Sequence, residues 1–157
     1  MFKKLSLLIS AILTVISCGG SKQPEGRLMS YRYSCSGSMA QPIHDFTLKR
    51  IDDKTCQVIF FNHDAEPRTI DYEFVQDTIL QPIQLIDSVE TIVRQNKMWK
   101  YKEHYSPAFE VLDGNSWSLS FTFDGAEPSS SSGYHATPKG GGISQVVNML
   151  KQYIPGI

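Results

Sequence analysis

From residue 27 onward the chain alternates apolar and polar positions in short runs, which is the period of a half-buried β-strand. In the run from Ser116 to Phe123, for example, Trp117, Leu119 and Phe121 share one face. The turn at 52–54 would join two such runs as a hairpin. Alternation and strand-like composition predict strands over 27–35, 43–51, 55–61, 69–75, 109–112, 116–123 and 129–134.

Two other stretches repeat their apolar residues at helical spacing instead. The first is expected to start at an N-cap on Asp77 or Thr78, to take Pro82 in its first turn, and to end near Asn96. Its apolar stripe would consist of Ile79, Ile83, Ile86, Val89 and Val93. The second would open with the glycines 140–142, with Ile143, Val146, Val147 and Leu150 on its buried face. The pattern as a whole predicts an α+β fold: an antiparallel sheet of about six to seven strands with two helices packed on one face.

Length and charge narrow the class of protein. A chain of 157 residues is most simply one domain. The formal charge is −1, and removal of residues 1–17 would leave 13 of the 15 basic residues against 16 acidic ones, a charge of −3. A mildly acidic domain without a basic stripe is a poor nucleic-acid binder. We therefore expect no nucleic-acid partner.

The first 17 residues are typical of an export signal. Lys3 and Lys4 form a positive start, and residues 5–17 are apolar apart from small hydroxyl residues. These thirteen residues would extend about 20 Å as a helix, whereas the hydrocarbon core of a bilayer is roughly 30 Å thick. The length therefore argues against a permanent transmembrane helix.

The end of this segment, Val15-Ile16-Ser17-Cys18-Gly19, resembles the lipobox of bacterial lipoproteins. The resemblance implies that a diacylglyceryl group alkylates the Cys18 thiol and that cleavage leaves Cys18 as the first residue. The lipid chains would then hold the protein in a membrane. Residues 1–17 would be the signal peptide, 18–26 a lipidated tether, and 27–157 the single folded domain. Gly19 follows the cysteine where aspartate would favour inner-membrane retention, so the outer membrane of the cell envelope is the expected location.

Two further cysteines, Cys35 and Cys56, would share the oxidising compartment that export implies. One interpretation is a disulfide between them, which would add about 3 kcal/mol in the chain-entropy model. The other is a pair of separate buried thiols on neighbouring strands. The sequence leaves both open.

The last third of the chain carries a second pattern, DG-x-x-W-x-L, then DG, then S-G-x-x-x-x-P. Its residues are Asp113-Gly114, Trp117, Leu119, Asp124-Gly125, Ser132, Gly133 and Pro138. It resembles small uncharacterised lipoproteins of the Bacteroidales type. The resemblance implies a bacterial envelope protein and brings no activity with it.

Candidate binding residues cluster after the first predicted helix. The stretch 98–105 mixes aromatic and basic side chains, and Trp99, Tyr101 and Tyr105 are of the kind favoured in recognition surfaces. Tyr134 and His135 form a second candidate nearby. The alternative is that Trp99 and Tyr101 cap the core.

The sequence favours a non-enzymatic binding or accessory role at the envelope, with a protein or a glycan as partner and the membrane held through lipid on Cys18. The four histidines, His44, His63, His104 and His135, lie in separate segments without metal-ligand spacing, so no metal and no cofactor is expected. The alternative is an envelope hydrolase that uses histidines and acidic residues from separate loops.

Overall fold

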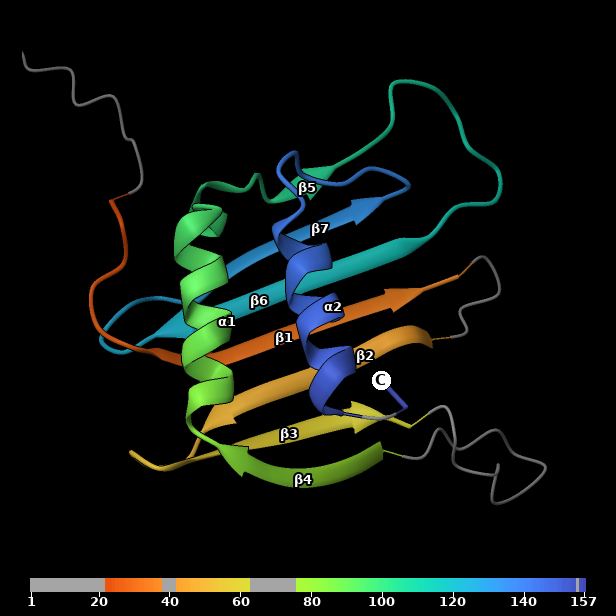
Figure 1. Ribbon diagram of the computed structural model, residues 1–157. Coiled ribbons are helices and arrows are strands. Elements are labelled where there is room, and N and C mark those ends of the chain that lie inside the picture. The colour runs from red at the N-terminus through yellow and green to blue at the C-terminus, as the bar shows by residue number, and fades with distance from the viewer. Residues whose placement is uncertain (1–21, 38–41, 63–75, 155) are drawn as a thin grey trace, which may run out of the picture.

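A seven-stranded sheet carries two helices on one of its faces (Figure 1). The computed structural model describes residues 22–37, 42–62, 76–154 and 156–157. The strands are β1 (Leu28–Ser36), β2 (Pro42–Arg50), β3 (Thr55–Phe61), β4 (Gln76–Pro82), β5 (His104–Tyr105), β6 (Ser116–Phe123) and β7 (Ser129–Tyr134). Their order is β4-β3-β2-β1-β6-β7-β5, and neighbours are antiparallel except for β5 and β7. The predicted α+β class is confirmed.

The core lies between this sheet and the helices α1 (Gln84–Gln95) and α2 (Gly142–Tyr153). One face of each central strand supplies apolar side chains, as the period of two requires. On the helices, residues three and four apart face the sheet. The buried set includes Tyr31, Phe46, Leu48, Val58, Leu119 and Phe121 from the sheet and Ile86, Val89, Val93, Val146 and Leu150 from the helices.

The opposite face of the sheet is polar, and among the described residues no helix covers it. Serine hydroxyls line up across β1, β6 and β7 on this face. They do so because serine alternates with apolar residues in β6 and with aromatic residues in β1, and the residues of β7 that face Ser118 and Ser120 are also serines. Ser34 Oγ and Ser118 Oγ, for instance, lie 2.8 Å apart on paired residues. An antiparallel sheet with one packed and one solvated face has this alternation.

The start of the first helix differs from the prediction. Residues 76–82 form β4, which pairs with β3 along its whole length, and α1 begins only at Gln84. Asp77 and Thr78 are therefore strand residues and not N-caps, and the residue at the N-cap is Ile83, which makes no side-chain cap bond. Pro82 ends a strand at the edge of the sheet, where its missing donor costs little. The predicted end near Asn96 is confirmed.

The sheet also ends differently on its other side. Residues 109–112 do not form a strand; Phe109 and Leu112 are 72% and 89% exposed. The free edge of β7 pairs with the short parallel strand β5 instead, which alternation could not reveal in two residues. The predicted strand over 69–75 lies outside the described residues.

Cys35 and Cys56 are both free thiols, so the disulfide interpretation is wrong. The strands that carry them are not neighbours, because β2 lies between β1 and β3. On β2 their partners are His44 and Arg50. Six residues of strand separate those partners by about 20 Å, far beyond the reach of a disulfide.

Candidate functional site

Arg94 on α1 holds the segment that precedes strand β1. Its Nη1 donates to the carbonyl of Pro24 at 2.8 Å, and its Nη2 donates to that of Gly26 at 2.6 Å. Its Nε donates to Glu90 Oε1 at 2.8 Å, and the guanidinium lies 4.6 Å from the centre of the Phe123 ring. Charge-assisted bonds to backbone carbonyls are among the stronger hydrogen bonds. The segment 24–26 is therefore fixed to the domain.

Glu90 continues the same network into the first strand. Its Oε2 accepts a bond from the Leu28 backbone N–H at 2.8 Å. Arg50, whose side chain is 5% exposed, donates to the Leu28 carbonyl at 3.0 Å and to Asp87 at 2.6 Å. Both backbone groups of Leu28 are thus held by side chains. Cys18 lies outside the described residues, and no helix among the described ones is long and apolar enough to span a membrane.

Trp99 and Tyr101, two of the residues singled out in the sequence, line a groove of about 240 Å³. They belong to the segment that leaves α1 through the short helix η1 (Met98–Lys100). We call this hollow the aromatic groove. Its walls combine aromatic rings, hydroxyl groups and one carboxylate, from Met98, Trp99, Tyr101, Glu103, Phe121, Pro128, Ser129, Ser130 and Ser131.

The groove exists because β7 turns only small side chains toward the helices. Ser129, Ser131 and Gly133 lie opposite the large residues of β6 on that face. The segment after η1 lies against them: Ser131 Oγ donates to the Lys102 carbonyl at 2.6 Å, and Ser132 N donates to that of Glu103 at 2.9 Å. These bonds fix the backbone beside the aromatic side chains, so the groove is preformed.

Trp99 and Tyr101 also pack against the core, as the alternative interpretation expected, and so does Tyr105. The Tyr101 and Tyr105 rings meet edge to face at 6.4 Å, and Tyr105 lies 5.9 Å from Trp117. Burial raises the pKa of the Tyr101 phenol above its ordinary value, with a smaller contribution from Tyr105. Trp99 and Tyr101 therefore both line the groove and pack on the core, whereas Tyr105 packs on the core without lining the groove.

Tyr134 and His135 lie at a different place and hold loops together. The Tyr134 hydroxyl donates to the Val111 carbonyl at 3.0 Å, and the His135 N–H donates to the Asn115 carbonyl at 2.8 Å. His135 has a positive φ of 47° and packs closely on Gly114. The structure thus separates these two residues from the aromatic groove and shows contacts of a structural kind.

The sequence pattern in the last third of the chain, which includes Trp117 and Gly133, also has a structural basis. The Trp117 indole donates to the Ala136 carbonyl at 2.7 Å, across the backbone of Gly133. A Cβ on Gly133 would lie 2.5 Å from both that carbonyl oxygen and the indole nitrogen. We call this contact the Trp117 lock. It ties β6, β7 and the loop after β7 together.

A serine and a histidine lie close together on the polar face. Ser132 Oγ lies 3.2 Å from His104 Nδ1 and 3.2 Å from the Glu103 carbonyl, to which it donates. His104 is exposed at the edge strand β5, and Ser132 is half-buried. In the part of the chain that the structure describes, no three His, Cys, Asp or Glu side chains are grouped as a metal would need. His63 lies outside that part.

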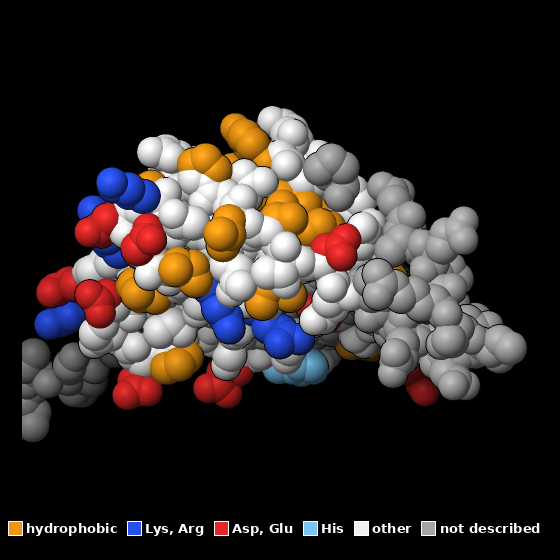
Figure 2. Space-filling model, turned by 90° about the horizontal axis from the view of Figure 1, so that it is seen from below, with side chains coloured by type: hydrophobic (Ala, Val, Ile, Leu, Met, Phe, Trp, Pro, Cys, Tyr) orange, Lys and Arg blue, Asp and Glu red, His pale blue; other side chains and the backbone are white. Residues whose placement is uncertain are grey.

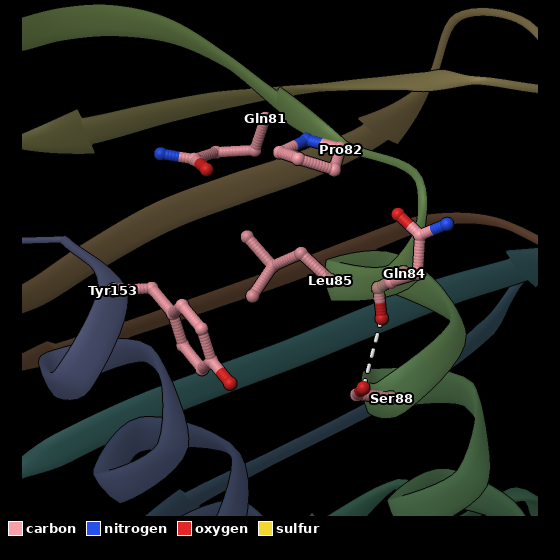
Figure 3. Close-up of a pocket in the computed structure, with 6 residues that line it drawn as sticks. All are labelled: Gln81, Pro82, Gln84, Leu85, Ser88 and Tyr153. Carbon is pink, nitrogen blue, oxygen red and sulfur yellow. Dashed lines mark hydrogen bonds between the residues drawn. The ribbon is translucent and has the colours of Figure 1, made fainter.

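Two other hollows, each of about 300 Å³, lie elsewhere on the domain. One is on the polar face, between Arg32, Lys49 and Asp45. The other lies between the start of α1, the end of α2 and β4, where Leu85 and Tyr153 point toward each other (Figure 3). Neither was visible in the sequence, because each combines residues from three or more elements. No protein-family model and no curated protein matches the chain.

Proposed function

We propose that this protein is a lipid-anchored binding module of the bacterial cell envelope, and that the aromatic groove binds a glycan. The observation that carries the proposal is the meeting of Trp99 and Tyr101 with the hydroxyl-bearing strand β7 in one preformed hollow. Aromatic rings offer a flat apolar face to the C–H groups of a sugar and a polar tip for its hydroxyls. Serine hydroxyls and the Glu103 carboxylate supply further donors and acceptors.

The anchoring half of the proposal rests on the lipobox resemblance around Cys18 and is supported by the Arg94 network. Because the chain is held from Pro24 onward, only the six residues 18–23 remain as a tether. Six residues reach at most about 20 Å. Lipid on Cys18 would therefore keep the domain next to the bilayer, within reach of the outer membrane and the polymers beside it.

Labelling with an alkyne-bearing fatty acid tests the anchor. We expect label and membrane fractionation of the wild-type protein, and loss of both in Cys18→Ser. A Cys35→Ser variant is the control, since it removes a half-buried thiol that is not part of the lipobox. Wild-type protein that stays in the soluble fraction without label would refute the anchor and leave the groove proposal standing.

Tryptophan fluorescence tests the groove, because the chain has only two tryptophans. Titration with soluble peptidoglycan fragments and with outer-membrane oligosaccharides should change the emission of Trp99. Trp99→Phe should abolish that signal, since the remaining Trp117 is buried in the lock. Calorimetry on Tyr101→Ala should show affinity weakened by at least about tenfold, near 1.4 kcal/mol. Absence of saturable binding by all of these glycans would refute the glycan proposal.

The pair of Ser132 and His104 supports a second candidate function, an envelope hydrolase. In it, the Ser132 hydroxyl would turn from the Glu103 carbonyl to His104 Nδ1, which would accept its proton. A fluorophosphonate probe that labels the wild-type protein and not Ser132→Ala would favour it. Ser130→Ala is the matched control, because Ser130 lies two residues away on the same face of β7. Equal labelling of all three proteins, or none, would exclude this candidate.

A further inference from the structure

Strand β4 is the last strand of the described sheet on its side, with β3 as its only partner in the sheet order. Figure 2 views the molecule from this side and shows hydrophobic side chains at the surface. Alternate backbone N–H and C=O groups of an edge strand point away from the sheet. Such an edge accepts another extended chain through main-chain hydrogen bonds. The occupant that fits an edge of this kind is a strand.

The helix side of this edge has a hollow for a side chain. The hollow of about 300 Å³ is walled by Pro82, Leu85 and Tyr153, and its polar lining consists of the uncharged Gln81, Gln84 and Ser88. Figure 3 shows the Leu85 side chain between Pro82 and the Tyr153 ring. Tyr153 is 57% exposed although it ends an amphipathic helix. Apolar walls without a charged group suit an aliphatic or aromatic side chain.

The polar side of the same edge carries a second apolar residue. Leu80 lies in the middle of β4, points away from the helices, and is 66% exposed. Successive residues of a strand point to opposite faces. A strand added to β4 would therefore place one side chain over the hollow beside Tyr153 and its neighbour against Leu80.

We propose that the β4 edge binds an extended, apolar segment of a partner protein as an eighth strand, with one of its side chains in the hollow beside Tyr153. The inference is independent of the glycan proposal, because the aromatic groove lies at the other edge of the sheet, beside β7. A protein with both sites would connect a polypeptide and an envelope glycan on one lipid-anchored domain.

The test uses the full chain in detergent and fluorescein-labelled nine-residue peptides, with threonine alternating with leucine, isoleucine, valine or phenylalanine between terminal lysines. Fluorescence anisotropy should show saturable binding. Leu80→Lys and Tyr153→Ala should each weaken it by at least about tenfold. Both side chains are more than half exposed, so these variants should fold. Leu112→Ala is the control, because Leu112 is 89% exposed in a loop away from β4 and α2.

Backbone methylation of the peptides distinguishes strand addition from simple apolar contact. N-methyl groups on one alternate set of amides should abolish binding, because those amides face β4. The same groups on the other set should leave binding within about twofold of the parent peptide. Equal binding by both methylated sets, equal binding by the Leu80 and Tyr153 variants, or no saturable binding by any parent peptide would overturn the proposal. A wild-type dimer that Leu80→Lys converts to a monomer would also overturn it, in favour of a second copy.

Discussion

The two edges of the sheet are built in opposite ways. On the β6–β7 side, strand β5 covers the edge, small residues let a segment pack against β7, and the Trp117 lock closes the loops. On the β3–β4 side the edge strand keeps exposed apolar residues and a hollow beside it. The first side is built from close backbone contacts that tolerate little change. The second is an exposed surface, where substitutions should change the stability of the fold little but should weaken the binding proposed for the β4 edge.

The largest effect is expected at the Trp117 lock. Gly133→Ala would place a methyl group 2.5 Å from the Ala136 carbonyl oxygen and from the Trp117 indole nitrogen. The backbone would have to shift and the indole bond would be strained or lost, so we expect a loss of about 2–4 kcal/mol in the free energy of unfolding. Chemical denaturation measures it. Gly37→Ala is the control, because a methyl there has ordinary contacts of 3.8 Å or more; equal stability of the two variants would contradict the lock.

Arg94→Ala should have the next largest effect. It removes three charge-assisted hydrogen bonds and the packing on Phe123, at a partly buried site, for an expected loss of about 1–3 kcal/mol. Hydrogen exchange should increase at Leu28, the first residue of β1. Arg27→Ala is the comparison, since the Arg27–Asp53 ion pair is exposed and should contribute less than about 1 kcal/mol. Unchanged exchange at Leu28 in Arg94→Ala would show that the segment is held by other contacts.

Tyr31→Phe tests the centre of the sheet, where the two sides meet. Tyr31 stacks between Phe46 and Phe121, and its buried hydroxyl has no hydrogen-bond partner among the described residues. Removal of that hydroxyl should leave stability unchanged or raise it by up to about 1 kcal/mol. A loss above about 1 kcal/mol in thermal unfolding would show that the hydroxyl is satisfied in solution.

The same variant should change the alkaline limit of stability. Burial raises the pKa of the Tyr31 phenol well above its ordinary value, and burial does the same for Tyr33. A group of this kind contributes stability in full below the unfolded pKa of about 10 and loses it as the pH rises further. Stability measured from pH 8 to 12 should therefore fall less steeply in Tyr31→Phe than in the wild type.

The smallest effect is expected at the β2–β3 turn, on the open side. The Asp52 carboxylate accepts the Lys54 and Thr55 N–H groups at 2.7 and 2.8 Å, and the Lys54 bond is the main cause that lowers its pKa. A lowered pKa contributes stability above the unfolded value of about 4, which is lost as the pH falls through the folded value. Asp52→Ala should be slightly less stable than the wild type at pH 7, and this difference should shrink as the pH falls below about 4. A stability deficit of Asp52→Ala that stays the same from pH 7 to pH 2 would contradict this account.

The sequence by itself determined the fold class, the solvated and buried faces of most strands, and the second helix. These follow from periodicity, which is a local property. Periodicity predicted the wrong element at 77–83. Ile79 and Ile83 have helical spacing there, but β4 pairs with β3 along seven residues, and this pairing stabilises a strand more than one helical turn would stabilise a helix. Periodicity also failed at 104–105, because two residues have no period.

Only the tertiary structure decided the arrangement of the sites. It placed Trp99 and Tyr101 beside the serines of β7, and it separated Tyr134 and His135 from them. It put β2 between the two cysteines and bonded the segment before β1 to Arg94. The hollow beside Tyr153 also has no local signature. Each of these features joins residues far apart in the chain, and the order of the strands, which no local pattern records, brings them together.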